Sequence, residues 1–372
     1  MKNKGKNDKT LFITLGVIVL IALAVIIGVT IKQKSIDKVE VANNNLDSSK
    51  VEEKEEVKEE AKEEAKPEIK IFNGNDRPMA FMIDNNKNAQ PQASLNSTYM
   101  VYEIIVEGGE SRLMALFKGV DADQVGPIRS SRHYFLDYAS ENDAIYAHLG
   151  MSPQAEADFG PMGINNINGQ IYDTGKSRTS TSLYWRATHK HAPHNAYTNT
   201  KNIKEICKQR GYRTTSDKES VLNYVPEEVT LDSYADAKVA NSIVIPYHGA
   251  HKVQYKYDAN TKRYTRYSKG KMMKDEMTKE PVTTKNIIVT FAKNYDLVDK
   301  EKKGRQNVET VGTLKGYYLT NGKAIEIQCV KKSRKEQTKY LDMQGNEIKV
   351  NDGNTWVNIC PIDSNVVISD KI

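Results

Sequence analysis

The 372-residue chain is poor in the residues that mark several large classes of protein. Its 3 Cys are too few for a disulfide-dense miniprotein, and its 22 Gly are too few for a collagen. Hydrophobic residues make up 38% of the chain, below the roughly 45–50% that is typical of soluble domains. This low apolar content excludes a polytopic membrane protein.

Strong charge of one sign is also missing. Residues 1–68 hold 12 Lys/Arg and 13 Asp/Glu, and subtraction from the totals of 54 and 48 leaves 42 and 35 for residues 69–372. The net charge is therefore −1 in the first segment and +7 in the second. Because nucleic-acid binding needs a stronger basic field than this, we expect no nucleic-acid partner.

The three cysteines, Cys207, Cys329 and Cys360, leave two interpretations open. Two of them can pair in an extracellular protein, but the apolar, strand-like surroundings of Cys329 and Cys360 fit buried free thiols equally well. There is no CxxC pair, so a zinc knot is not expected. The first cysteine lies far from the N-terminus, so a lipid-modified N-terminus is not expected either.

One long uncharged run is present, the 21 residues Leu11–Ile31. A helix needs about 20 such residues to cross a bilayer, and the lysines that precede the run place residues 1–10 in the cytoplasm. We therefore predict a single transmembrane anchor at 11–31. The alternative is a cleaved signal peptide, although the run is longer than a usual signal core and Gly28–Ser35 shows no small-x-small cleavage site.

Residues 32–68 are predicted to form a charged linker. Within it, residues 52–66 repeat one Lys, two Glu and one Ala or Val. The Glu-to-Lys pairs recur at helical spacing and favour a solvated, semi-rigid spacer that ends at Pro67. Such a spacer either holds the ectodomain away from an anionic surface or serves only as a solvated connection.

Residues 69–212 alternate short apolar strands with short helices, which predicts an α/β or α+β domain. Glu107-Gly108-Gly109-Glu110 is expected to be the turn of a hairpin, because glycines accept positive φ. Strands are predicted at 79–83, 99–106, 112–117 and 143–149, and helices from Ser130 or Ser131 to Tyr138, from Ser152-Pro153 to Asp158, and from Thr198–Thr200 to Arg210.

Residues 213–241 are interpreted as a connecting stretch, and residues 242–372 as mainly antiparallel β-structure. Period-two alternation and the Asn321-Gly322 turn predict these strands, which lie at 253–257, 263–267, 286–291, 314–319, 323–329, 339–342 and 355–359. The expected fold is thus an α+β (or α/β) N-terminal ectodomain plus a smaller antiparallel β-domain, behind a single N-terminal transmembrane helix.

The hairpin at 253–267 interleaves tyrosines with lysine and arginine. On an exposed sheet this pattern can stack sugars or bind an anionic polymer. The simpler interpretation is a hairpin with one packed face and one solvated face.

The order of several motifs resembles the YerB family of Gram-positive envelope proteins, whose two domains have no known function. The motifs are Ala80–Asp84, Val101–Glu103, Val106–Gly109, Arg112, Val125–Arg132, His148 and Pro193–Tyr197. The most specific piece is Gly126-Pro-Ile-Arg-Ser-Ser-Arg132, and the resemblance spans about residues 70–365. It implies an extracytoplasmic envelope protein and names no reaction. Members often look like lipoproteins, and this chain departs from them in its predicted anchor and its lack of a lipobox cysteine.

Glu107 is a candidate acid/base, because it ends a strand beside two glycines that leave its carboxylate uncrowded. Glu103 on the same strand face would lie about 13 Å away, too far for the roughly 5–9.5 Å of a glycosidase pair. Glu107 would then act alone or with Asp84. The alternative is that Glu107 only forms an ion pair with Arg112 across the hairpin.

Arg129 and Arg132 bracket Ser130 and Ser131 and form a candidate anion site, to which Arg112 and Asp84 also belong. Guanidinium groups match phosphate and carboxylate bidentately, and either serine can cap a helix whose first N–H groups favour anions. The alternative is that one arginine pairs with Asp84 or Glu107 and fixes the fold.

His148 ends a strand, where ligands of α/β sheets usually bind, and is a second catalytic candidate. The alternative is a structural histidine, since no Gly-x-Ser-x-Gly elbow supports a triad. His189, His191 and His194 have a spacing that can serve zinc, but such a loop motif has low specificity. We expect His194 and Asn195 to line the cleft or fix the loop, with no metal and no cofactor.

Two functions follow from these residues. The first is a membrane-anchored envelope enzyme, a hydrolase or lyase of peptidoglycan or another envelope glycan, with Glu107 as acid/base and Arg129 and Arg132 as anion clamp. The second is a non-catalytic envelope module that binds a wall polymer or partner protein through the same arginine pocket. Both place the chain in the cell membrane with its C-terminal domains outside, in contact with a cell-wall polymer or lipid-linked precursor.

Overall fold

The computed structural model describes residues 68–249, 251–298 and 300–371. The predicted tail, anchor and nearly all of the linker lie outside these residues. Within the described ranges, no helix is long and apolar enough to cross a membrane. The described residues belong to one compact unit, Ala65–Ile372, and are mostly β-structure with few helices.

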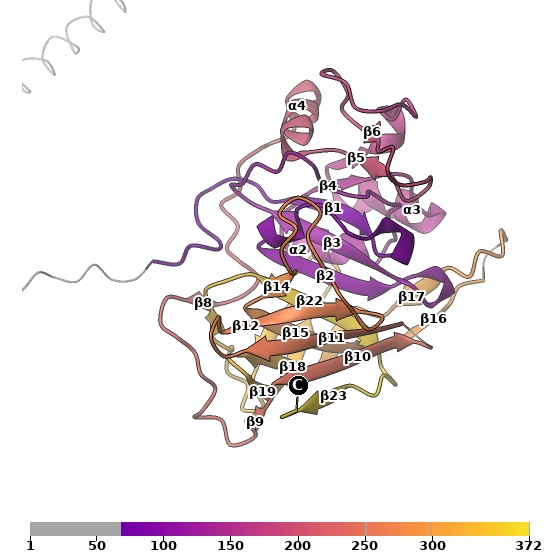
Figure 1. Cartoon of the computed structure of the whole chain (residues 1–372). Helices are drawn as coiled ribbons and strands as arrows, with labels where there is room; N and C mark the ends of the chain where they lie inside the picture. Colours follow the sequence, from indigo (N-terminus) through magenta and orange to yellow (C-terminus); the bar gives the residue numbers. More distant parts are fainter. Residues whose placement is uncertain (1–67, 250, 299, 372) are drawn as a thin grey trace, which may run out of the picture. The chain divides into compact units, whose positions relative to one another are not determined.

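The larger sheet contains strands from both predicted ectodomain segments (Figure 1). Its order is β20-β19-β18-β15-β22-β2-β3-β1-β4-β5, with β9 paired to β19. The strands are β1 (Met79–Asp84), β2 (Met100–Ile105), β3 (Ser111–Phe117), β4 (Ile145–His148), β5 (Asn166–Asn168), β9 (Lys238–Val239), β15 (Asn286–Ala292), β18 (Gly312–Thr320), β19 (Lys323–Lys331), β20 (Lys339–Leu341) and β22 (Thr355–Pro361).

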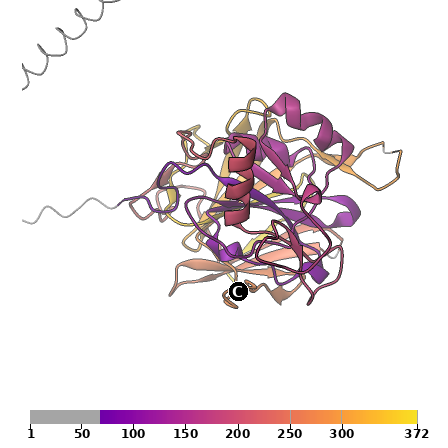
Figure 2. The ribbon, with the colours of Figure 1, turned by 90° about the horizontal axis from the view of Figure 1, so that it is seen from above.

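The second sheet is antiparallel, in the order β13-β12-β11-β10-β23 with β14 paired to β12. Viewed from above, its salmon and orange strands form a layer at the lower edge of the molecule (Figure 2). The strands are β10 (Ser242–His248), β11 (His251–Asp258), β12 (Arg263–Ser268), β13 (Lys271–Met272), β14 (Thr283–Thr284) and β23 (Val367–Ser369).

Three two-stranded ladders complete the β-structure of the described residues. They pair β6 (Trp185–Arg186) with β7 (Ala196–Tyr197), β8 (Tyr224–Val225) with β21 (Val350–Asn351), and β16 (Asn294–Asp296) with β17 (Gln306–Val308). The β16–β17 hairpin projects from the body at the right of Figure 1.

The described residues hold three α-helices, α2 (Phe135–Glu141), α3 (Pro153–Met162) and α4 (Thr200–Arg210). The predicted start of α3 is confirmed, because the Ser152 side chain accepts from the Ala155 N–H and Pro153 opens the helix. The predicted end of α4 is confirmed too, since Gly211 takes φ 63° at the C-cap.

The helix predicted to start at Ser130 or Ser131 is wrong by several residues. The Ser131 N–H donates to the Gly150 carbonyl at 2.9 Å, and the Ser152 N–H donates to the Ser131 carbonyl. The backbone of Ser131 is therefore extended and hydrogen-bonded to the segment after β4. As a result, α2 begins only at Phe135, and it has no side-chain cap.

Strand β22 joins the two segments of the chain. It runs parallel to β15 on one side and to β2 on the other. Strands from both predicted segments therefore share one continuous sheet. The proposed division at 213–241 stays a prediction.

The two sheets pack face to face around a buried core. Tyr255 and Tyr264 are buried, and Arg266 is fully buried with its guanidinium 4.3 Å from the Trp356 ring centroid. Lys256 and Tyr267 point to the opposite, partly exposed face of the hairpin. The interpretation of 253–267 as a hairpin with one packed face is confirmed.

Candidate functional site

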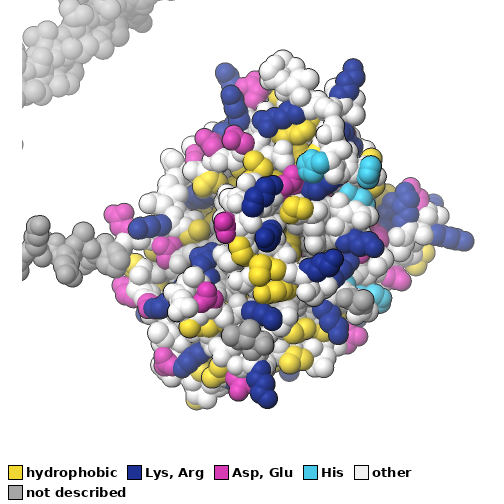
Figure 3. Space-filling model, viewed as in Figure 1, with side chains coloured by type: hydrophobic (Ala, Val, Ile, Leu, Met, Phe, Trp, Pro, Cys, Tyr) yellow, Lys and Arg dark blue, Asp and Glu magenta, His cyan; other side chains and the backbone are white. Residues whose placement is uncertain are grey.

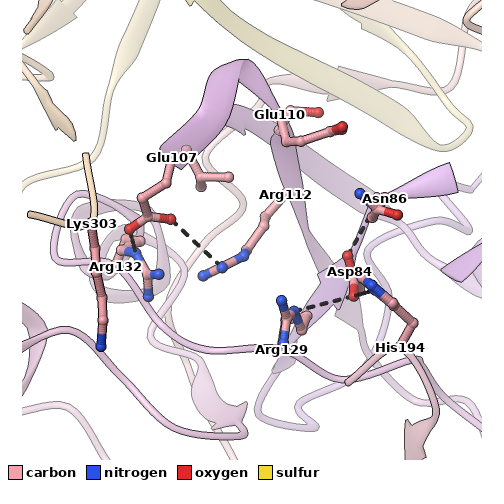
Figure 4. Close-up of a pocket in the computed structure, with 11 residues that line it drawn as sticks. Asp84, Asn86, Glu107, Glu110, Arg112, Arg129, Arg132, His194 and Lys303 are labelled. Atoms are coloured by element: carbon pink, nitrogen blue, oxygen red, sulfur yellow. Dashed lines mark hydrogen bonds and ion pairs between the residues drawn. The ribbon is translucent and has the colours of Figure 1, made fainter. Parts of the chain in front are cut away.

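Most of the predicted site residues line one cavity of about 350 Å³ (Figure 4). That volume lies within the range of ligand pockets, about 300–1,000 Å³. The lining residues come from the end of β1, the β2–β3 hairpin, the segment before α2, the loop before β7 and the β16–β17 hairpin. They are Asp84, Asn86, Val106, Glu107, Glu110, Ser111, Arg112, Arg129, Arg132, His194 and Lys303.

Glu107 is placed by a tight turn that needs glycine. Gly108 and Gly109 have φ of 69° and 68°, in the left-handed region that favours glycine. A Cβ on Gly109 would lie 2.4 Å from Cδ2 of His248. The turn closes with the Val106 N–H donating to the Glu110 carbonyl at 2.7 Å, and it holds Glu107 at the pocket.

The arginines Arg129 and Arg132 are carried by an extended segment threaded between the ends of β1 and β4. The Arg129 N–H donates to the Met82 carbonyl at 2.8 Å, and the Leu149 N–H donates to the Arg129 carbonyl at 3.0 Å. Gly126 has φ 147°, and a Cβ there would meet the Ala196 carbonyl oxygen at 2.8 Å. These backbone hydrogen bonds hold the segment in place, so that the side chains of Arg129 and Arg132 line the pocket.

Glu107 is held between two arginines. Its Oε1 accepts a short hydrogen bond from Arg132 Nε, and its Oε2 lies 3.7 Å from Arg112 Nη2. Burial acts to raise the pKa of Glu107, but the hydrogen bond and charge of Arg132, with the charge of Arg112, outweigh burial and lower it. The predicted ion pair with Arg112 is present, and Arg132 is the nearer partner.

Arg112 is the most deeply placed of the three arginines, with 9% of its side chain exposed. Its Nη1 donates to the Ser130 carbonyl at 2.5 Å. Burial lowers the pKa of Arg112 to about 10, and the charges of Arg132 and Arg129 act in the same direction. Arg112 therefore remains a cation at neutral pH.

Asp84 makes a second cluster on the other side of Arg112 (Figure 4). Its Oδ2 lies 3.1 Å from Arg129 Nε and 2.7 Å from His194 Nδ1, and its Oδ1 accepts from the Asn86 N–H at 3.0 Å. The Asp84 side chain is only 5% exposed. The pocket thus combines three carboxylates, three guanidinium groups, one ammonium group and one imidazole.

His148 does not reach the pocket, which corrects its prediction as a catalytic candidate. It is fully buried and stacked on Phe159 at 5.1 Å. Its Nδ1 lies 2.9 Å from the Gly150 carbonyl and its Nε2 lies 3.3 Å from Asn166 Oδ1. Burial lowers the pKa of His148 to about 4, so it stays neutral and structural.

Ser130 and Asn195 also serve the fold and do not line the pocket. Ser130 Oγ donates to the Leu149 carbonyl at 3.0 Å. Asn195 Nδ2 donates to the carbonyls of Ala187 and Lys190 and thereby fixes the loop that carries His194. For Asn195 the loop-fixing alternative is confirmed.

The other loop histidines serve different partners from His194. His189 Nε2 lies 2.9 Å from Glu276 Oε1, whereas His194 contacts Asp84 and His191 is exposed. The same loop is pinned by Lys190, whose Nζ donates to Glu276 at 2.6 Å. These histidines therefore do not converge on a common point.

Sequence reasoning missed five lining residues: Asn86, Val106, Glu110, Ser111 and Lys303. Lys303 arrives from the β16–β17 hairpin, and no local signal connects it to residues about 170 positions earlier. Asn86 could have been found, because an Asn that caps a short 3-10 turn just after Asp84 is a common turn signal.

A larger hollow of about 820 Å³ lies over β18 and β19. It is lined by Phe291, Thr313, Leu314, Lys315, Gly316, Tyr317, Glu326, Ile327, Gln328, Met343 and Ile362. None of the predicted site residues is among them. The convergence of charged groups makes the smaller pocket the candidate site.

Comparison with known proteins identifies the family. Residues 65–213 match the "Protein of unknown function (DUF3048) N-terminal domain" and residues 243–357 match its C-terminal domain. The "Putative lipoprotein YerB" of Bacillus subtilis (strain 168) is 30% identical over 299 residues, 77% of this chain and 81% of that protein. The crystal structure of the YerB protein from Bacillus subtilis matches with a TM-score of 0.68 and 28% identity, covering 79% of this chain and 94% of that chain. The chain belongs to the YerB family.

Proposed function

We propose that the chain is a membrane-attached, extracytoplasmic envelope protein whose arginine pocket binds a phosphate-bearing ligand, either a wall polymer or a lipid-linked precursor. The name of the Bacillus subtilis relative, "Putative lipoprotein YerB", supports attachment to the envelope. The uncharged run at 11–31 supports attachment through the N-terminal segment.

The main support for the binding proposal is the partly exposed guanidinium group of Arg129. Its side chain is 25% exposed and contacts Asp84 only as an ion pair at 3.1 Å. Among the described residues no acceptor takes a hydrogen bond from its guanidinium group, which has five N–H donors. Since Arg112 and Arg132 line the same pocket, a phosphate at Arg129 would meet further positive charge.

A local pocket, not a broad basic surface, accounts for anion binding in this proposal. On the face shown in Figure 3, Lys and Arg side chains are interspersed with Asp and Glu side chains. The partner is therefore expected to place a discrete phosphate in the pocket.

The glycan-directed alternative, with Glu107 as acid/base, has less support. A general acid must hold a proton near neutral pH, which requires a raised pKa. The pKa of Glu107 is instead lowered by Arg132 and Arg112 against the effect of burial. Binding through the arginines needs no proton on Glu107.

Arg129→Gln tests the proposal. Because a hydrogen bond to a charged group contributes about 1.5–3 kcal/mol, we expect the variant to bind poly(glycerol phosphate) roughly 10- to 100-fold more weakly, measured by titration calorimetry. Arg213→Gln is the matched control, since Arg213 also pairs with an aspartate, Asp143, but lies outside the pocket. Undiminished binding by Arg129→Gln, or no binding by the wild-type chain, would contradict the proposal.

A further inference from the structure

His194 and Asp84 form a pair with the geometry of a general base and its orienting carboxylate. Nδ1 of His194 lies 2.7 Å from Oδ2 of Asp84. Because a carboxylate can only accept, Nδ1 carries the proton in this contact. In the neutral imidazole the lone pair is then on Nε2.

The orienting carboxylate is itself fixed. Asp84 ends β1, its Oδ1 accepts from the Asn86 N–H, and Arg129 pairs with Oδ2, the same oxygen that contacts His194. His194 is also fixed, because its N–H donates to the His191 carbonyl at 2.8 Å and the neighbouring Asn195 ties the loop to Ala187. Because the His194 ring and the Asp84 carboxylate are already held in place, ligand binding does not have to restrict their motion.

The free nitrogen of the imidazole is open to the pocket. His194 is a lining residue with 16% of its side chain exposed. Within the described residues its Nε2 has no hydrogen-bond partner, and Nε2 is not one of the buried unpaired polar atoms. A water molecule in the pocket can therefore reach the lone pair.

The arginines supply what such a base would need for phosphate chemistry. Arg112 and Arg129 lie beside the pair, and Arg132 lies beyond Glu107 (Figure 4). Fixed guanidinium groups stabilise the charge that builds on phosphoryl oxygens during displacement. A glycosidase would instead need a protonated carboxyl group, which the arginine-held Glu107 does not provide.

We infer that the pocket hydrolyses a phosphodiester, with His194 as general base and Asp84 as its positioning residue. The inference rests on the proposed function, since it uses the same pocket and ligand class. His194 Nε2 takes a proton from water, and the water oxygen forms the new P–O bond. The P–O bond to the ester alcohol breaks, its oxygen is protonated by solvent, and the imidazolium returns its proton to solvent. The products are one phosphomonoester and one alcohol.

The experiment uses the full chain purified in detergent, with two probes. Release of p-nitrophenolate from bis(p-nitrophenyl) phosphate and of glycerol phosphate from poly(glycerol phosphate) measures hydrolysis, and calorimetry measures binding of the polymer. His194→Gln should lower hydrolysis about 100-fold or more, the usual effect of losing a general base, and should keep polymer binding within about threefold, because Gln leaves the arginines in place. Asp84→Asn should also lower hydrolysis, since it removes the charge that orients the ring.

His191→Gln is the matched control, because His191 is an exposed histidine of the same loop. It should leave both hydrolysis and binding unchanged. If the wild-type chain binds the polymer but hydrolyses neither probe, the catalytic inference is overturned while the proposed function stands. Hydrolysis that persists in His194→Gln also overturns the inference. If the wild-type chain does not bind the polymer, the proposed function itself fails.

Discussion

At the scale of single residues, the pocket is a set of compensated charges. Glu107 is shared by Arg132 and Arg112, and Asp84 is shared by Arg129 and His194. Each carboxylate therefore occupies a position that an anionic ligand would also favour. Removing a carboxylate should strengthen anion binding, whereas removing an arginine should weaken it.

Glu107→Gln tests this reasoning directly. Loss of one negative charge at contact distance from two arginines changes the local interaction by about 1–4 kcal/mol, depending on solvent screening. We expect poly(glycerol phosphate) to bind at least several-fold more tightly, measured by calorimetry at constant salt.

Glu110→Gln is the comparison variant for Glu107→Gln. Glu110 lines the same pocket but pairs with the partly exposed Lys269 at 2.8 Å. Loss of the Glu110 charge should change the affinity for poly(glycerol phosphate) less than loss of the Glu107 charge does. Weaker binding by Glu107→Gln would show that Glu107 contacts the ligand or holds Arg132 in its binding position.

The sequence predicted which residues gather at the pocket better than what each one does. The sequence names Glu107 from its strand end beside two glycines, Arg129 and Arg132 from the two serines between them, Asp84 as their possible partner and His194 from the family motif, and all five line the pocket. Which arginine pairs with which carboxylate was not predictable, since that depends on differences of a few ångströms between side chains.

The burial of His148 was equally hidden from the sequence. Its position at the end of β4 suggested exposure, but the ring turns into the body and stacks on Phe159 of α3. Such stacking depends on how a helix crosses the sheet, which no local pattern specifies.

At the scale of secondary-structure elements, locally encoded features were predictable. The β2–β3 and β18–β19 hairpins follow from Gly108-Gly109 and Asn321-Gly322, and α3 and α4 follow from their caps. The position of β22 in the sheet was not predictable, because its pairing with β2 joins residues about 250 positions apart. Local signals specify elements, and long-range packing specifies their order.

The two glycines of the Glu107 turn give an element-scale prediction. Ala at Gly108 or at Gly109 should cost about 1–2 kcal/mol in unfolding free energy for the left-handed backbone. Gly109→Ala should cost more, because its Cβ would also meet His248, whereas nothing lies within 4 Å at Gly108. Urea denaturation measures both variants.

A His248→Ala background isolates the contact with His248. In that background the excess cost of Gly109→Ala over Gly108→Ala should shrink, since the ring contacts at 2.4 and 2.9 Å are gone and only the Cβ at position 248, 3.1 Å away, remains close. Equal costs in the wild-type background would show instead that the His248 ring rotates away freely.

At the scale of the whole molecule, a buried ion pair connects the two sheets. Arg266 of β12 donates to Glu103 of β2 at 2.6 Å, and both side chains are fully buried. Ser111 and Asn85 donate to the other oxygen of Glu103. The same strands that carry the pocket are thus tied to the second sheet just beneath it.

The pH dependence of this pair follows from the pKa of Glu103. Burial acts to raise that pKa, but Arg266 and His251 outweigh burial and lower it below its ordinary value. The stabilisation is therefore fully present above the pKa of Glu103 in the unfolded chain. It is lost as the pH falls through the lowered pKa of the folded protein.

Glu103→Gln is the variant that tests the connection between the sheets. It leaves the Arg266 charge buried without its counter-ion, and breaking a buried pair in this way costs roughly 3–5 kcal/mol. We expect a loss of that size in urea denaturation at neutral pH, followed by the fluorescence of Trp356 beside Arg266. The difference in unfolding free energy between the variant and the wild-type chain should narrow as the pH falls through the lowered pKa of Glu103.

The double variant Glu103→Leu/Arg266→Met removes both charges and should recover much of the lost stability. The control variant is Lys269→Gln, which breaks the partly exposed pair with Glu110 and should cost at most about 1 kcal/mol. A loss below 1 kcal/mol in Glu103→Gln would mean that this ion pair contributes little to holding the two sheets together.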